Sequence, residues 1–384
     1  MKNITLTTLL MTTLLFSACR KTDAQDKGPS PRKHPQPALS VFPVPGAYDT
    51  AAISGALKDS LNHTVKDLFL ITGMPGLSAA MIVPGKGLWR TDTGYLSLPE
   101  QKQVNNNSVF YWASVGKLLT ATVIEQLIQE KKLNHDSKLS GWFPALQDAG
   151  KITIAELLNH TSGIYSFNND PKVFAIDRYY SPDELIGLAR AQKNHFPPGK
   201  NWSYSNTNYL LLALIAEKTE GKPFDEIIRD RIALPLHLTS LRALKPQEKI
   251  AGLALAHQNG QVIKEDYSVP LGAGNIVSNA RDMVVVLYSL MTGKLGPVAQ
   301  VHERLKDLYA MPDAGTWYGR GVMLTDFNEI THTDDLWIGH SGGTQTYRAL
   351  LVYDTASKTF IAVAINAHIS AEAVARKLLV TALQ

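Results

Sequence analysis

A serine and a lysine three residues apart are the first residues in this chain that could perform chemistry together. Ser114 is followed by Lys117, after which apolar residues recur at three- and four-residue spacing, as in an amphipathic helix. Residues three apart share one helix face, so the lysine amine could take the proton of the serine hydroxyl. The helix N-terminus would add N–H donors where an oxyanion develops. Taken alone, the pair also fits an N-cap serine beside a solvated lysine.

Two further patterns could complete such a site. Tyr204 and Asn206 lie in a polar stretch before an apolar helical pattern. A phenol beside an ammonium can act as a general base, and an asparagine amide can hold a substrate carbonyl or the lysine. Residues 339–343 (Gly-His-Ser-Gly-Gly) lie on or beside a strand-like segment. The glycines would let a substrate lie against the strand, and the Gly343 N–H could join the Ser114 N–H in an oxyanion hole.

Two other chemistries were considered. Residues 339–343 also match the Gly-x-Ser-x-Gly nucleophile elbow, with Ser341 as nucleophile. An elbow needs a strand before it and a helix after it, whereas residues 344–353 are strand-like and little chain follows. The eleven histidines form no His-Glu-x-x-His motif, and His332 with Asp334 is too sparse for a metal site. We therefore expect no metal and no cofactor.

Helical and strand-like patterns are mixed at both ends of the chain, while residues 136–264 are rich in helix signals. The roughly 335 residues after the N-terminal segment are long for one compact core. We therefore expect one lobe from residues 47–135 plus 265–384, and a helical lobe from residues 136–264. The predicted helices span 50–70, 208–219, 278–291 and 370–383, capping boxes start helices at 153–156 and 181–184, and the predicted strands span 77–83, 87–95, 336–338, 347–353 and 360–365.

The N-terminal segment predicts export. Residues 1–19 combine a lysine, an apolar run and Ser-Ala-Cys19, the pattern of a signal peptide. Cys19 is the only cysteine, so no disulfide framework is expected, and its position resembles the lipid-acceptor cysteine of bacterial lipoproteins. The alternative is a chance cysteine near an ordinary cleavage site, because Phe16 stands where lipoproteins usually have leucine. We expect an exported, periplasmic protein anchored to a membrane at Cys19, with residues 20–46 as a proline-rich tether.

Charge excludes one class of partner. The formal net charge is +4, and it comes entirely from Lys2 and the tether, so the rest of the chain is neutral. A neutral folded part lacks the basic surface that nucleic acids require, and we expect no nucleic-acid partner.

Ser114-Val-Gly-Lys117, Tyr204-Ser-Asn206 and His340-Ser-Gly342, in this order, resemble the motifs of the penicillin-recognising serine hydrolases. This family includes class C β-lactamases, D-alanyl-D-alanine carboxypeptidases, D-aminopeptidases and related esterases. The resemblance covers nearly all of residues 50–384. Longer segments that are similar to the family are 157–163, 204–209, 272–282 and 339–343.

The resemblance implies an α+β fold, the β-lactamase / DD-peptidase fold, in which an antiparallel sheet is flanked by helices and carries an inserted, mostly helical lobe. It implies an acyl-enzyme reaction on amide or ester bonds of a small molecule or peptide, such as peptidoglycan-derived peptides, esters or β-lactams. His160 lies in a family segment for which we expect a structural role. The implied site residues are Ser114 as nucleophile, Lys117 and Tyr204 as proton-handling partners, and Asn206, His340, Ser341 and Gly342 as substrate ligands.

One departure from the family pattern bears on the substrate. Class C β-lactamases usually carry Lys-Thr-Gly at the third motif, where this chain has His340. A neutral imidazole holds a carboxylate less strongly than a lysine, so we expect weak β-lactam hydrolysis. No residue is assigned to activate the deacylating water. The alternative function is a slowly reacting penicillin-binding sensor or scaffold.

Overall fold

The computed structural model describes residues 31–44, 46, 48–173 and 178–384. The expected signal peptide, Cys19 and residues 20–30 of the expected tether lie outside these ranges. Among the described helices, none is both long enough and apolar enough to cross a bilayer.

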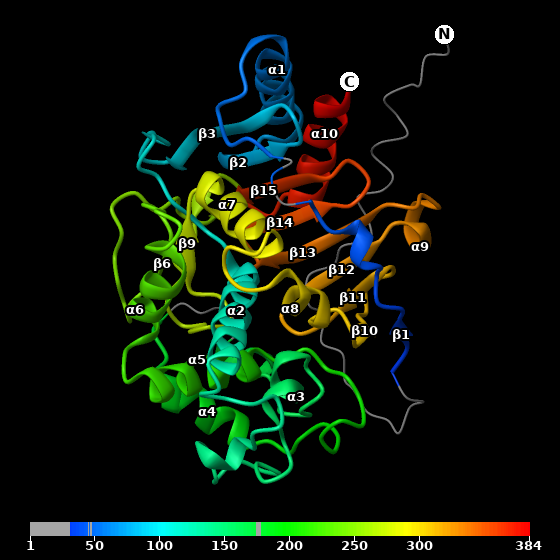
Figure 1. Cartoon of the computed structure of the whole chain (residues 1–384). Helices are drawn as coiled ribbons and strands as arrows, with labels where there is room; N and C mark the ends of the chain where they lie inside the picture. Colours follow the sequence, from blue (N-terminus) through cyan, green and yellow to red (C-terminus); the bar gives the residue numbers. More distant parts are fainter. Residues whose placement is uncertain (1–30, 45, 47, 174–177) are drawn as a thin grey trace.

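The largest element of the described chain is an antiparallel sheet of ten strands (Figure 1). Strands from both ends of the sequence meet in its middle, where β15 pairs with β2. This confirms the expected α+β class with an antiparallel sheet. In spatial order the strands are β1 (Lys33–His34), β10 (Leu308–Ala310), β11 (Thr316–Tyr318), β12 (Met323–Asp326), β13 (Leu336–Gly343), β14 (Arg348–Asp354), β15 (Thr359–Ile365), β2 (Gly76–Val83), β3 (Gly87–Ser97) and β4 (Lys102–Gln103).

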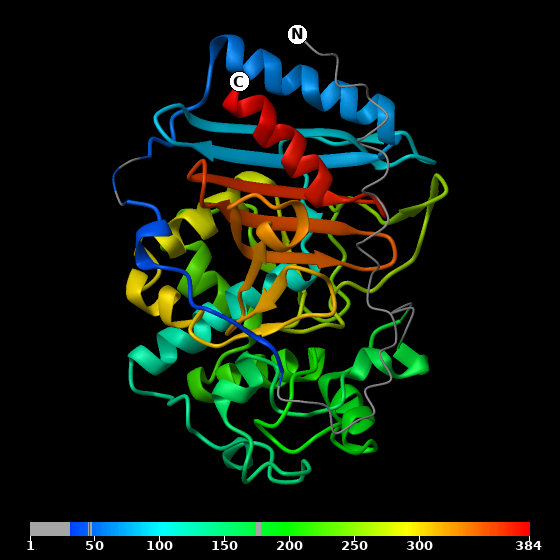
Figure 2. The same cartoon turned by 90° about the vertical axis from the view of Figure 1, so that its right-hand side faces the viewer.

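Helices cover both faces of this sheet because its central strands are apolar on both sides. In β2, Leu77, Ala79 and Met81 pack in the cluster that contains α1 (Gly55–Thr72) and α10 (Ala371–Leu383). Ala80 and Ile82 point to the opposite face and join the larger core that contains α7 (Ala280–Met291). Figures 1 and 2 show α1 and α10 on one side of the sheet and α7 on the other. The sheet is thus flanked by helices, as expected.

A mostly helical part lies below the sheet in both views. Its α5 packs on α2, the helix that follows Ser114, and this contact joins the two parts of the molecule. Both predicted capping boxes are present, at Thr153 and Ser181. The other α-helices are α2 (Gly116–Gln129), α3 (Ile154–Leu158), α4 (Pro182–Arg190), α5 (Asn206–Glu220), α6 (Phe224–Ile228), α8 (Val298–Glu303) and α9 (Asn328–Thr331). Three-residue 3₁₀ turns are η4 (Leu139–Gly141), η5 (Phe167–Asn169) and η6 (Pro171–Val173), and η7 (Arg229–Ala233) is a π-helix that continues α6.

The predicted boundary of the helical lobe at residue 264 stays a prediction, and short strands lie on both sides of it. Short strands return the chain to the sheet side before residue 264, because β6 pairs with β9 and Leu255 N–H bonds to Leu96 O. These contacts join residues far apart in sequence, so local patterns did not reveal them. The strands concerned are β5 (Phe110–Tyr111), β6 (Arg242–Ala243), β7 (His257–Gln258), β8 (Gln261–Val262) and β9 (Ile276–Ser278).

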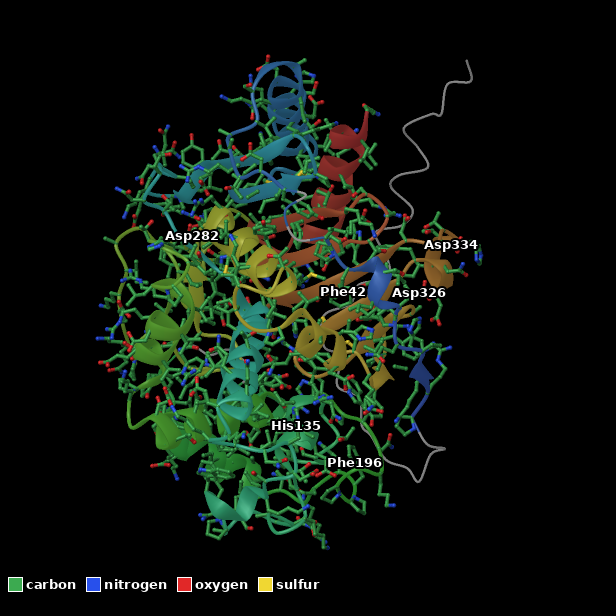
Figure 3. The ribbon with its side chains drawn as sticks, viewed as in Figure 1. Phe42, His135, Phe196, Asp282, Asp326 and Asp334 are labelled. Carbon is green, nitrogen blue, oxygen red and sulfur yellow. The ribbon has the colours of Figure 1, made fainter. Side chains whose placement is uncertain are left out.

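The described end of the expected tether is packed, which corrects that prediction. Lys33 and His34 form β1, which pairs with β10 at the edge of the sheet. After the turn η2 (Leu39–Val41), Phe42 is buried with 4% of its surface exposed. Figure 3 places Phe42 where this segment meets the sheet. Prolines are compatible with an edge position, and the apolar residues between them supply the packing.

Candidate active site

Ser114 lies in a tight turn immediately before α2. The turn is the 3₁₀ segment η3 (Ala113–Val115), and its first residue, Ala113, has φ +46°, a conformation that non-glycine residues rarely adopt. Such strain persists only where the surroundings hold the backbone. Here Trp112 is fully buried and bonds to β9 through both its backbone N–H (2.9 Å to Ile276 O) and its indole N–H (3.0 Å to Ser278 O). The half-buried Ser114 is therefore presented by a fixed turn.

Lys117 is completely buried directly behind Ser114. Its Nζ lies 3.1 Å from Ser114 Oγ and donates a second hydrogen bond of 2.6 Å to Ala273 O. The carbonyl comes from the segment Gly272-Ala-Gly274, whose Gly272 O also accepts a 2.6 Å bond from Thr120 Oγ1 of α2. The expected contact between serine and lysine is present. The motifs did not predict the carbonyl at Ala273, although it lies in segment 272–282, which is similar to the family.

The phenol of Tyr204 belongs to the same group. Lys117 Nζ lies 4.9 Å from the centroid of the Tyr204 ring and 5.6 Å from that of Tyr209. An ammonium over an aromatic face is attracted by the ring quadrupole, which offsets part of the cost of burying the charge. Tyr209 was not singled out from the sequence, where it reads as one more apolar position of α5.

Asn206 starts α5 beside Tyr204 and is held from two sides. Its backbone N–H donates to Ser166 Oγ (2.8 Å), and its Nδ2 donates to Asn168 Oδ1 (2.7 Å). The amide orientation is thereby fixed. Its role as a ligand of substrate remains a prediction.

Strand β13 brings the third motif against the turn that contains Ser114 (η3), called the nucleophile turn below. A Cβ atom on Gly342 would lie 2.9 Å from Ser114 N and 2.5 Å from Trp112 O, so only glycine allows this approach. Gly343, the next residue, is exposed to solvent. The structure therefore places the strand beside the Ser114 N–H, and the use of the Gly343 N–H as the second oxyanion donor stays a prediction.

His340 does not have the geometry expected of a carboxylate ligand. It has no exposed surface; its Nδ1 is 2.5 Å from Ser341 O, and its Nε2 is 3.1 Å from Tyr318 Oη. A carbonyl only accepts, so the proton sits on Nδ1 and Nε2 accepts from the phenol. Burial, and secondarily the nearby Lys117, lower the pKa of His340 to about 3. His340 is therefore an internal residue that ties β13 to β11, and its role as a substrate ligand stays a prediction.

Ser341 also differs from the elbow alternative. It lies inside β13, which continues to Gly343 and then turns into β14 without an intervening helix. Its hydroxyl lies 3.5 Å from Met323 Sδ, and its N–H is 3.4 Å from the same sulfur. A serine in the middle of a paired strand does not occupy the strained strand-to-helix turn that defines the elbow.

The segment that follows Ala273 anchors the site to α7. Asp282, labelled in Figure 3, is buried in the first turn of that helix. Its Oδ2 accepts hydrogen bonds from Thr239 N–H (3.1 Å) and Ser240 N–H (2.8 Å). These bonds attach the segment that leads from the helical lobe back to the sheet to the start of α7. In the described ranges, no three His, Cys, Asp or Glu side chains are grouped to hold a metal ion.

Comparison with known proteins gives three informative similarities. The chain is 31% identical over 166 residues to penicillin-binding protein 4* of Bacillus subtilis, a match covering 41% of this chain and 36% of that protein. It spans less than two thirds of the length of the next two curated relatives that it matches. D-amino acid amidase from Ochrobactrum anthropi SV3 superposes with a TM-score of 0.74 at 22% identity, over 85% of this chain and 98% of the amidase. The D-stereospecific amidohydrolase from a Streptomyces species gives 0.67 at 27% identity, over 84% and 96%.

The family assignment rests on the extent of a further match. The Beta-lactamase family model matches residues 61–384, which include the three motifs and nearly all of the sheet. This agrees with the resemblance that the motifs predicted. The chain therefore belongs to the Beta-lactamase family.

Proposed function

We propose that this protein is a serine hydrolase that forms an acyl-enzyme at Ser114 and acts on amide or ester bonds. The observation that carries the proposal is the 3.1 Å contact between Lys117 Nζ and Ser114 Oγ, in which the buried lysine also bonds to Ala273 O and lies over the Tyr204 ring. Tight positioning of a nucleophile beside a proton-transfer group is what acyl transfer requires.

In the proposed reaction, Ser114 Oγ forms a bond to the substrate carbonyl carbon while its proton passes to the group formed by Lys117 and Tyr204. The resulting oxyanion lies near the Ser114 N–H. Collapse breaks the bond to the amine or alcohol, which leaves with a proton from the same group. Water then attacks the ester on Ser114 and releases the acid, which restores the hydroxyl.

The open edge of β13 supports a substrate with an extended backbone. β12 pairs only with residues 336–339, whereas β14 pairs along the whole strand to Gly343. No described strand covers the other edge of residues 340–343. An extended peptide could therefore add to this edge by main-chain hydrogen bonds, next to Ser114.

We infer that amides and esters of D-amino acids are the substrate class to test first. The support is the similarity to a D-stereospecific amidohydrolase, together with the internal position of His340, which leaves the third motif without an exposed cation. β-Lactams, which present a carboxylate, should be turned over weakly.

An active-site serine probe tests the proposal. Mass spectrometry should find the label on Ser114, and Ser114→Ala should abolish both labelling and turnover of a p-nitrophenyl ester. Ser341→Ala is the matched control and should retain both. Loss of activity confined to Ser341→Ala would refute the assignment. Stoichiometric labelling with no turnover of any ester or amide would instead identify the protein as a slowly reacting sensor.

We also propose export and lipid anchoring at Cys19, on the sequence pattern alone. Globomycin treatment and Cys19→Ala should each change the processing of the protein or its membrane fractionation. If neither changes membrane fractionation, the anchor does not exist.

A further inference from the structure

His160 combines burial with an unusual backbone. It has no exposed surface, and its φ of +65° places it in the left-handed region. This conformation is energetically unfavourable for residues that carry a β-carbon. From the sequence, we expect only a structural role for His160. The contacts of His160 indicate a more specific one.

Two hydrogen bonds to His160 flank Tyr204. The backbone carbonyl of His160 accepts from Ser203 N–H (3.1 Å), and its Nδ1 accepts from Ser205 N–H (3.2 Å). We call these two bonds the His160 clasp. Because the bonds hold the residues immediately before and after Tyr204, they fix the backbone that carries the phenol.

The clasp requires one form of the imidazole. Ser205 N–H can only donate, and Asn208 Nδ2 lies 3.4 Å from the same nitrogen, so Nδ1 carries no proton. The proton is then on Nε2, which is buried and has no hydrogen-bond partner among the described residues. Burial, with smaller effects of Lys117 and His340, holds the pKa of His160 well below its ordinary value. The ring therefore stays neutral while it accepts.

The same ring packs on the catalytic phenol. The centroids of the His160 and Tyr204 rings are 4.3 Å apart, and Tyr318, the partner of His340, lies 4.5 Å from His160. Tyr204 in turn faces Lys117 at 4.9 Å. His160 thus contacts the Tyr204 ring with its own ring and holds the two residues on either side of Tyr204 by hydrogen bonds.

We infer that His160 is a positioning residue that sets the Tyr204 phenol against Lys117 and Ser114. This inference rests on the proposed function, because it assigns His160 to the geometry of proton transfer in that reaction. It predicts that removing the Nδ1 acceptor slows acylation more than it weakens substrate binding.

Two substitutions separate the acceptor from the backbone requirement. Glycine and asparagine both tolerate a positive φ, but only asparagine retains an acceptor that can reach Ser205 N–H. For His160→Gly we expect kcat/KM on a p-nitrophenyl ester about 100-fold lower, carried mostly by kcat, as for a misplacement of roughly 1 Å. For His160→Asn we expect most of the wild-type rate. His237→Gly is the control, since His237 is an exposed histidine with φ +53°.

The outcomes are distinct. If His160→Gly lowers thermal stability but leaves kcat unchanged, or if His160→Asn is as slow as His160→Gly, the positioning role is refuted. Nitrogen-15 NMR of the histidine-labelled wild type gives a test that needs no variant. It should show the His160 proton on Nε2 and no protonation at the pH where an ordinary imidazole titrates. A proton on Nδ1 would overturn the clasp, whereas absence of a labelled Ser114 in wild type would refute the proposed function instead.

Discussion

Substitution of Gly342 by alanine tests whether β13 and the nucleophile turn form one rigid unit. The added methyl carbon would lie 2.5 Å from Trp112 O, 2.9 Å from Ser114 N and 3.0 Å from Val115 N. All three are backbone atoms of the turn, which the hydrogen bonds of Trp112 fix to β9. No flexible side chain can therefore move aside to make room for the methyl group. The strand or the turn must therefore shift.

The size of the shift follows from the shortest contact. Restoring an ordinary separation between the methyl carbon and Trp112 O requires a movement of about 1 Å. A misplacement of this size in a catalytic geometry costs about 100-fold in rate, or about 2.7 kcal/mol of transition-state stabilisation. Overpacking should also lower the free energy of unfolding by about 1–3 kcal/mol.

The assay compares Gly342→Ala with Gly187→Ala. Gly187 lies inside α4, and a Cβ atom there would meet nothing within 4 Å. Gly187→Ala should keep the wild-type kcat/KM on a p-nitrophenyl ester and gain about 0.5–1 kcal/mol of stability. Gly342→Ala should lose kcat and the rate of labelling at Ser114 together. Wild-type kinetics in Gly342→Ala would refute the idea that this approach sets the geometry of the site.

Four further predictions follow from buried residues. Because the pKa of His340 is about 3, its imidazole should stay neutral between about pH 5 and about pH 9. The kcat/KM for an anionic substrate, divided by that for a neutral substrate, should therefore show no imidazole titration over this range. His340→Lys should not improve nitrocefin turnover and should destabilise the fold, because it buries a charge without a partner; a gain on nitrocefin would show that this position does meet substrate. In the unfolded state His340 binds a proton near pH 6.5, whereas in the folded state it does so only near pH 3. The free energy of unfolding of the wild type should therefore fall as pH is lowered through that window, and it should fall less in His340→Gln. Thermal unfolding at several pH values measures the difference. Phe42→Ala should lower the free energy of unfolding, measured with denaturant, by about 3 kcal/mol. Leu39→Ala is the control: Leu39 is 54% exposed, so its loss should change stability little. Equal effects of the two substitutions would contradict the packing of this segment.

Local sequence signals predicted the elements that form through local interactions. The capping boxes at Thr153 and Ser181 gave the starts of α3 and α4. Strands β2 and β3 were predicted because two strand-like runs flank the short turn at residues 84–87. The contact between Ser114 and Lys117 was predictable because it spans one helical turn.

Contacts between distant segments were not predictable in this way. The short strands β10, β11 and β12 have only three or four residues each, too few for a pattern, so Tyr318 and its bond to His340 were missed. The role of His340 was taken from the third motif alone, and nothing in that motif shows that β11 closes over the imidazole. The strand β1 was hidden for the same reason, since its partner lies about 275 residues away in sequence.

The two internal histidines and Lys117 together define the electrostatics of the site. His160 and His340 are both buried, and the charge of Lys117 contributes to lowering the pKa of each. The neighbourhood of the nucleophile therefore has one buried amine and two imidazoles that stay neutral. A protonated imidazole beside Lys117 would disfavour the ammonium form, whereas a neutral ring leaves the lysine's proton exchange with Ser114 and Tyr204 unopposed. In the proposed reaction, the neutral His340 would add no positive charge to those of Lys117 and Arg304, both of which contribute to lowering its pKa.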